Sequence, residues 1–191
     1  MSDSWEAERG RKLVHLATIV LPLWIWWIPP PWTWRGPLLA FLFVVIVDGL
    51  RLRVAVVRRW FAARVDPYLR VRERTAPVVA VHLLTGVGVL LAILSPRPIA
   101  ATALAYLVVG DAAAALVGRR FGTRRIGAKS LEGSLACFLC CLGIGALTLP
   151  QHPAAILGGA LAATLAEALP APIDDNWSVP LVSAAVLALL V

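Results

Sequence analysis

Seven apolar segments follow one another along the chain, and they constrain its fold more than any other feature. They cover Leu13–Ile28, Pro37–Leu50, Pro77–Leu94, Pro98–Gly118, Gly133–Leu149, Pro153–Leu169 and Val179–Val191. Soluble domains do not contain 60% hydrophobic residues arranged in such runs. None of the segments alternates with a period of two, so helices are expected rather than a barrel. The sequence therefore predicts an all-α polytopic membrane protein, with about seven transmembrane helices in a single domain over residues 1–191. Several runs fall short of the ~20 residues that cross a bilayer, so the first two helices must continue into their flanks.

Basic residues are distributed unevenly between the apolar segments. The N-terminal segment has three Lys or Arg, residues 51–74 have eight and residues 119–129 have five, whereas two other connections have one each. The positive-inside rule then places the N-terminus, residues 51–75 and residues 118–132 in the cytoplasm. On this topology all 11 acidic residues lie on the cytoplasmic side or near that end of a span. We expect a multi-pass protein of the cell membrane with its active site on the cytoplasmic face. The net charge of +7 reflects this orientation, so no nucleic-acid partner is expected.

The segment 51–75 contains a candidate interfacial helix. The stretch "VAVVRRWFAARV" puts Val54, Val57, Phe61 and Val65 near one helical face, with arginines beside it. This pattern is typical of a helix that lies on anionic lipid. A plain basic anchor, as the positive-inside rule requires, explains the same residues equally well.

The stretch "GTRRIGAKSLEGS" resembles a nucleotide P-loop at first sight. Gly122 and Gly127 have the P-loop separation, but Ala128 displaces Lys129 and Ser130 by one place, and no β-strand precedes the stretch. A membrane helix is expected before it instead, and Ser130 is placed to cap a second helix. A capped helix N-terminus beside Lys129 forms an anion site of another kind.

Further residues of the same stretch suit this anion site. Gly118 and Gly122 are expected at a helix end and a turn, and Gly133 would leave backbone amides open to close approach. Arg124 and Arg125 add positive charge. A basic loop followed by a capped helix explains these residues without any ligand.

Five acidic residues at the cytoplasmic ends of the predicted spans complete the pattern. Asp111 and Glu132 flank the basic loop, Glu167 ends the sixth span, and Asp174 and Asp175 follow it. Acidic groups at membrane depth are costly and usually functional. Carboxylates collected beside basic residues suit a polyphosphate bound with Mg²⁺, for which Asp111 and Glu132 are the first candidate ligands.

The stretch "GDAAAALVGRRFGTRRIGAKSLEGSLACF" resembles the signature of the CTP-dependent lipid kinases, which include dolichol kinase, phytol/farnesol kinase and a CTP-using diacylglycerol kinase. The matching residues are Gly110, Asp111, Ala114, Gly118, Gly122, Lys129, Ser130, Glu132, Gly133, Ser134 and Ala136. "RKLVH" resembles an N-terminal motif of the family through Arg11, Lys12 and His15. "EALPAPIDDNWSVPL" resembles another through Glu167, Asp175, Asn176, Ser178 and Pro180, although Trp177 replaces a more usual aliphatic residue. The longer signature of the related phosphatidate cytidylyltransferases is absent, which favours a kinase.

The resemblance implies transfer of the γ-phosphoryl group of CTP to the hydroxyl of a membrane lipid alcohol. Polyprenol, phytol or farnesol, and diacylglycerol are all open as substrates, with an isoprenoid alcohol preferred. The implied Mg²⁺ ligands are Asp111, Glu132, Glu167 and Asp175. The implied nucleotide-binding residues are Arg11, Lys12, Gly118, Gly122, Arg124, Arg125, Lys129, Ser130, Gly133, Ser134, Asp175 and Asn176. Either His15 or His82 is a candidate general base.

Two other functions remain open at this stage. A CDP-lipid synthase would use the same nucleotide and metal but transfer a cytidylyl group. A small membrane transporter would use Asp111 and Glu167 as proton carriers, although acids gathered on one side argue against it. The pair Gly158-Gly159 can pack within one chain or in a homo-oligomer.

Overall fold

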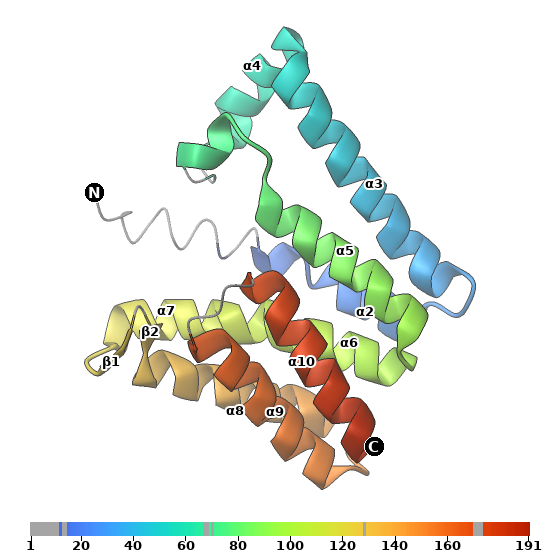
Figure 1. The fold of residues 1–191 in the computed structure, drawn as a ribbon, viewed down its shortest axis with the longest axis vertical. Coiled ribbons are helices and arrows are strands. Elements are labelled where there is room, and N and C mark those ends of the chain that lie inside the picture. The colour runs from blue at the N-terminus through green and yellow to red at the C-terminus, as the bar shows by residue number, and fades with distance from the viewer. Residues whose placement is uncertain (1–11, 13–14, 67–68, 70, 128, 170–173) are drawn as a thin grey trace.

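The computed structural model describes residues 12, 15–66, 69, 71–127, 129–169 and 174–191, and they form a helical assembly (Figure 1). The elements are α2 (Val20–Trp27), α3 (Trp32–Arg53), α4 (Ala55–Arg64), η2 (Val71–Arg74), α5 (Val79–Leu94), α6 (Arg97–Ala105), η3 (Tyr106–Gly110), α7 (Asp111–Phe121), β1 (Arg125–Ile126), β2 (Lys129–Ser130), α8 (Leu131–Thr148), α9 (Pro153–Ala168) and α10 (Asp175–Leu190). Every apolar segment of the sequence contains a helix, so the predicted helical class is confirmed.

The lengths of the helices support fewer membrane spans than the seven that the sequence predicts. Within the described residues, two helices are both long and apolar enough to cross a membrane, Arg97–Phe121 and Leu131–Thr148. The other apolar helices, such as Val79–Leu94 and Pro153–Ala168, are shorter than a bilayer requires. As expected, the second predicted segment gains length from its flank, because α3 begins at Trp32 and ends at Arg53.

The continuous helix α6–η3–α7 forms the centre of the structure. Its residues Leu104, Tyr106 and Val108 are fully buried. It packs against α8 and α10, and α9 packs between those two helices. Helix α3 lies apart from this bundle and contacts it through α5 and α2 (Figure 1). The middle of the central helix widens into a π-turn, η3, immediately before Asp111, and such turns are frequent at functional sites.

Small residues let the helices of this bundle approach closely. A Cβ atom on Gly110 would lie 2.9 Å from Cys137 Sγ and 3.1 Å from Cys141 Sγ. Both cysteines are buried in α8. Gly158 and Gly159 face Leu190 and Leu187 of α10, so this glycine pair packs within the chain.

The helix ends gather at two opposite ends of the structure (Figure 1). The α2–α3, α5–α6 and α8–α9 connections and the C-terminus lie toward the right of the view. Helix α4 and the hairpin β1–β2 lie toward the left. The second end therefore carries most of the basic loop residues of the described chain.

Two local features differ from the sequence prediction. The loop after Gly122 contains a short antiparallel hairpin, in which Arg125 pairs with Ser130 and Ile126 with Lys129. It turns at Gly127, whose φ of 60° suits a residue without a side chain. Helix α7 also continues past Gly118 to Phe121. A two-residue strand has too little periodicity to be found in a sequence.

The predicted interfacial helix forms as α4, but its orientation differs from the prediction. Phe61 is half-buried, with the guanidinium of the fully buried Arg51 5.5 Å from its ring centroid. Val57 is half-buried on the same side. The face expected on lipid therefore includes residues that pack toward the protein.

Candidate functional site

Asp111 is the first residue of α7, and two residues of the N-terminal motif, Lys12 and His15, reach its carboxylate. Lys12 Nζ donates to Asp111 Oδ2 at 2.5 Å, across 99 residues of sequence. His15 Nε2 lies 3.5 Å from the same oxygen. All three side chains are between 15% and 18% exposed. The motif partner Arg11 lies outside the described residues.

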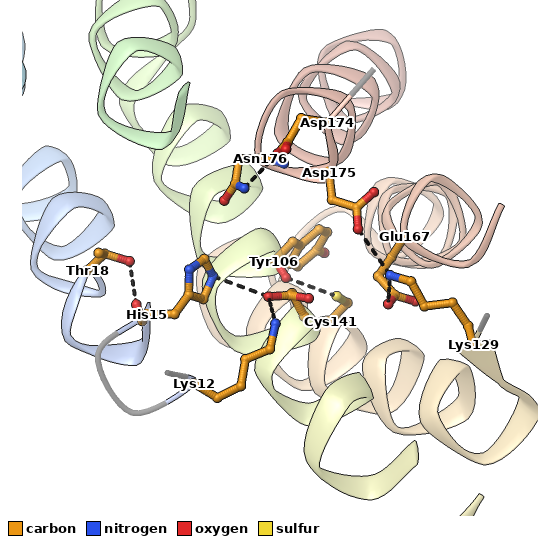
Figure 2. Close-up of polar contacts among 11 residues, drawn as sticks. Lys12, His15, Thr18, Tyr106, Lys129, Cys141, Glu167, Asp174, Asp175 and Asn176 are labelled. Carbon is orange, nitrogen blue, oxygen red and sulfur yellow. Dashed lines mark hydrogen bonds and ion pairs between the residues drawn. The ribbon is translucent and has the colours of Figure 1, made fainter. Parts of the chain in front are cut away.

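Lys129, in β2, makes a second group with two carboxylates (Figure 2). Its Nζ donates to Glu167 Oε1 at 2.5 Å and to Asp175 Oδ2 at 3.0 Å. Burial alone lowers the pKa of Lys129, but the hydrogen bonds and charges of Glu167 and Asp175 outweigh burial and raise that pKa. Lys129 therefore holds its positive charge firmly and links the hairpin to α9 and α10.

The two groups are close enough to affect each other. The charge of Asp111 acts on both Lys129 and Glu167. Within the described chain, Glu167 Oε2 is buried without a hydrogen-bond partner, and so is His15 Nε2. Glu167 is 2% exposed, so an Oε2 atom without a hydrogen bond costs free energy unless a ligand binds it.

Glu132 has a different role from the one expected. Its Oε1 accepts from the Thr123 backbone N–H at 3.0 Å and from the Thr123 hydroxyl at 2.5 Å. Both of its oxygens also accept from Arg124 N, at 3.2 and 3.4 Å. The expected pairing of Asp111 with Glu132 is replaced by a pairing of Glu132 with the loop. The structure brings Asp111 near Glu167 instead, which lies further along the chain.

The glycines of the central motif, which is the stretch Gly110–Phe138, contribute to the packing of the helices. Ser130 caps α8 as predicted, and its Oγ accepts from Gly133 N at 3.2 Å. That amide is therefore already bonded rather than open to a ligand. A Cβ atom on Gly133 would meet Ala114 O at 2.6 Å, and one on Gly118 would meet Ser130 Oγ at 2.7 Å. Gly122 has no room for a side chain either, because Ser130 lies against it. These glycines hold α7 against α8 and so fix Asp111 relative to Lys129.

The other predicted site residues lie at the hairpin, in α8 and in α10. Arg124 and Arg125 are exposed at the hairpin, and Ser134 is buried in α8 with its Oγ lacking a partner in the described chain. Asn176 is bonded to Asp174, through its backbone N–H at 3.0 Å and its side-chain amide at 2.7 Å. Asp174 caps α10, a role that the sequence analysis did not assign. Its place directly before the helical stretch "DNWSVP" was the available signal.

His82 belongs to a separate cluster. Its Nδ1 lies 2.8 Å from Val78 O, and its Nε2 is 3.6 Å from Asp48 Oδ2. Asp48 is paired at 2.5 Å with Arg51, which also donates to the carbonyls of Glu73 and Ala76. This cluster ties α3 to the start of α5, and within the described residues its polar groups are satisfied. His82 is therefore not brought to Asp111, whereas His15 is.

Two further polar groups near Asp175 were not singled out as site residues. Trp177 Nε1 and Ser178 Oγ are buried, and neither has a hydrogen-bond partner among the described residues. Both stand in the "DDNWSVP" stretch, where ligand contacts were expected from Asp175 and Asn176 but not from these two residues. Orphaned donors of this kind suit a bound polar molecule.

Comparison with known proteins does not assign the chain to a family. It is 24% identical over 157 residues to a Rickettsia prowazekii (strain Madrid E) protein described as uncharacterized protein RP860, covering 76% of this chain and 72% of the relative. No family model matches the chain. No solved structure matches it either.

A divalent cation at this centre would have to bind through few protein ligands. In the described chain, no group of three or more His, Cys, Asp or Glu residues is arranged to hold a metal ion. Mg²⁺ usually needs only one or two protein carboxylates, with water and substrate phosphates completing its shell. The vacant Glu167 Oε2, with Asp111 and Asp175 nearby, meets that requirement. The two lysine ammonium groups lie among these carboxylates, where they can also bind phosphate oxygens.

Proposed function

We propose that this chain is a multi-pass membrane enzyme that transfers the γ-phosphoryl group of CTP to the hydroxyl of a membrane lipid alcohol. The N-terminus, the segment 51–75 and the hairpin lie on the cytoplasmic side in this proposal, and about seven helices span the bilayer. The alcohol is an isoprenoid alcohol or diacylglycerol.

One observation carries the proposal: three sequence stretches that resemble the kinase motifs meet in one place. Lys12 and His15 come from the first, Asp111 and Lys129 from the second, and Glu167 and Asp175 from the third. Holding several acidic and basic side chains together within a helical bundle costs free energy, and such groups usually serve a function. Its chemistry suits a polyphosphate, because phosphoryl transfer depends mainly on positioning and charge stabilisation.

The outer surface of the bundle supports the membrane placement. Leucines four residues apart are exposed along α8, at Leu135 and Leu139, and along α9, at Leu157, Leu161 and Leu165. Exposed apolar rows of this kind suit lipid contact. The separation of helix ends into a basic end and a nearly uncharged end supports the proposed orientation.

Each residue of the site has a proposed role. Lys129 and Lys12 bind phosphate oxygens of the nucleotide, while Glu167, Asp111 and Asp175 hold Mg²⁺. The metal would supply charge neutralisation at the transferred phosphoryl group. Glu132 acts as a positioning residue, because it holds the 123–124 backbone that leads into the hairpin.

His15 is the proposed general base, in place of His82. Its Nε2 has no hydrogen-bond partner in the described chain and lies 3.5 Å from Asp111 Oδ2. That nitrogen can accept the proton of the alcohol while Asp111 stabilises the resulting imidazolium. The nitrogens of His82 face Val78 and Asp48, outside the group around Asp111.

The test follows phosphorus from labelled CTP. Purified protein in detergent or proteoliposomes is incubated with Mg²⁺ and either γ-labelled or α-labelled CTP. The acceptors are a panel of polyprenol, phytol, farnesol and diacylglycerol, with phosphatidic acid included. The proposal expects γ-label on one of the alcohols and CDP as the second product.

Matched variants separate a site effect from a folding effect. Asp111→Asn and Glu167→Gln should abolish transfer, whereas Asp66→Asn should retain it, because Asp66 is a buried carboxylate paired with Arg58 outside the site. α-label appearing on phosphatidic acid, with pyrophosphate released, would replace the kinase with a CDP-lipid synthase. Absence of both transfers in protein that binds CTP would refute the proposal.

A further inference from the structure

Helix α4 presents an outward face that the proposed reaction does not use. Val56 and Trp60 are 67% and 54% exposed, one helical turn apart. Arg59 and Ala63 lie between and beside them on the same face and are exposed as well. Large apolar side chains this exposed beside arginines usually mark a contact surface.

The opposite face of α4 fixes its orientation. Phe61 packs with Arg51, whose side chain is fully buried. Arg58 is paired with the buried Asp66 at 3.0 Å. The helix is therefore attached to α3 through the contact of Phe61 with Arg51, while Arg58 bonds to the turn that follows α4. Val56, Arg59 and Trp60 are left exposed on the other side.

The charge on this outward face has one sign. Arg53, Arg59 and Arg64 are exposed on or beside it, and the Arg64 guanidinium lies 5.7 Å from the Trp60 ring centroid. In the described part of the chain, Arg53 and Arg59 have no carboxylate partner. The nearest acidic residues in sequence, Asp48 and Asp66, are buried and paired with Arg51 and Arg58.

We infer that this face of α4 binds the headgroups of anionic lipids in the bilayer that holds the protein. Val56 and Trp60 would enter the boundary between headgroups and acyl chains, where Trp is favoured. Arg53, Arg59 and Arg64 would pair with lipid phosphates. This corrects the face expected from the sequence, since Val57 and Phe61 serve the attachment to the protein. The inference rests on the membrane placement proposed above and not on the reaction.

Binding of α4 to lipid would also affect the segment that leads into α5. Arg51 joins α3, Phe61 of α4 and the carbonyls of residues 73, 74 and 76 into one unit. A membrane surface that holds α4 therefore also holds the segment that leads into α5. Anionic lipid should stabilise this part of the protein more than neutral lipid does.

The test measures how closely Trp60 approaches each lipid. Full-length protein is reconstituted in phosphatidylcholine vesicles that contain phosphatidylglycerol, with bromine on the acyl chains of one lipid or the other. Trp fluorescence is compared between wild type and Trp60→Phe, so that the difference reports Trp60 alone. We expect this difference signal to be quenched more strongly by brominated phosphatidylglycerol than by brominated phosphatidylcholine.

Removing charge tests the role of the arginines. Each arginine near an anionic surface contributes roughly a fivefold preference, so Arg59→Gln should lower the phosphatidylglycerol preference about fivefold, and Arg59→Gln with Arg64→Gln further. Arg35→Gln is the matched control, because Arg35 lies at the other end of α3 between Trp32 and Trp34. It should leave the preference unchanged.

Each other result overturns the inference in a recognisable way. Equal quenching of Trp60 by both lipids would remove the anionic preference. No quenching of Trp60, with the other tryptophans still quenched, would mean that a protein or a second copy covers this face. Loss of quenching at every tryptophan would refute the membrane placement itself, independently of the kinase assay.

Discussion

Replacing Gly133 by alanine tests whether the central motif glycines serve packing or ligand binding. The new Cβ would lie 2.6 Å from Ala114 O and 3.2 Å from Gly118 Cα, both of them backbone atoms that cannot rotate away. Overpacking of this kind costs about 1–3 kcal/mol. Alanine in place of glycine in a helix returns about 0.5–1 kcal/mol, so the net effect should be destabilising.

The same helix offers a matched control for this change. Gly143 also lies in α8, but a Cβ there would meet nothing within 4 Å. Gly143→Ala keeps the helix gain without the clash, so the two variants should differ by about the overpacking cost alone. For a chain of this size, 1 kcal/mol corresponds to about 2–4 °C in Tm.

The measurement is thermal unfolding of both variants in the same detergent. We expect Gly133→Ala to unfold below wild type and Gly143→Ala at or above it. Equal shifts for the two variants would refute the packing argument, since both gain the same methyl group. In that case an anion held by the Gly133 amide would become the better explanation of this glycine.

Three further outcomes follow from the site. His15→Gln should lower kcat for phosphoryl transfer by 100-fold or more, about what general-base catalysis contributes, with KM for CTP little changed, whereas His82→Gln should retain most of the kcat. Because the folded-state pKa of Lys129 is raised, its ion pairs stabilise the protein fully below the ordinary lysine pKa of about 10.4 and are lost as the pH rises through the raised value. The Tm difference between wild type and Lys129→Met should accordingly be constant near neutral pH and narrow above about pH 10.4, and a constant difference at all pH values would contradict the ion-pair argument. Ser130→Ala should cost about 1 kcal/mol through loss of the α8 cap, seen as a lower Tm that Ser130→Thr largely restores.

Much of the helical fold could be predicted because apolar runs determine helices almost independently of one another. The cap at Ser130 was also predictable, since its side chain bonds only three residues away. The extension of α3 into its flanks was expected, but the continuation of α7 past Gly118 was missed, because polar residues such as Arg119 continue a helix without adding to its apolar run.

The arrangement of the site was harder to predict, because it depends on contacts between distant segments. Sequence proximity favoured a pair of Asp111 with Glu132, but in the structure Glu132 closes its own loop. Lys129 instead reaches Glu167 and Asp175, which are 38 and 46 residues away. No local pattern specifies which of several carboxylates a lysine will meet across a bundle. The orientation of α4 was predicted wrongly for a related reason, since its Phe61 face packs against Arg51 of another helix.

The charges of the assembled site lead to a prediction about the order of binding. Lys12 and Lys129 carry two positive charges, and Asp111, Glu167 and Asp175 carry three negative ones, so with His15 neutral the formal charge is −1. The negative charge of the site would repel a nucleoside triphosphate. One bound divalent cation changes the formal charge of the site to +1, which attracts it. We therefore expect CTP to bind to the purified protein only with Mg²⁺ present, and addition of EDTA to release it, as measured by equilibrium binding of labelled CTP. Glu167→Gln removes one negative charge and should make CTP binding less dependent on Mg²⁺ while transfer is lost. Equal CTP affinity with and without Mg²⁺ in wild type would show that the carboxylates do not bind the metal on which this argument depends.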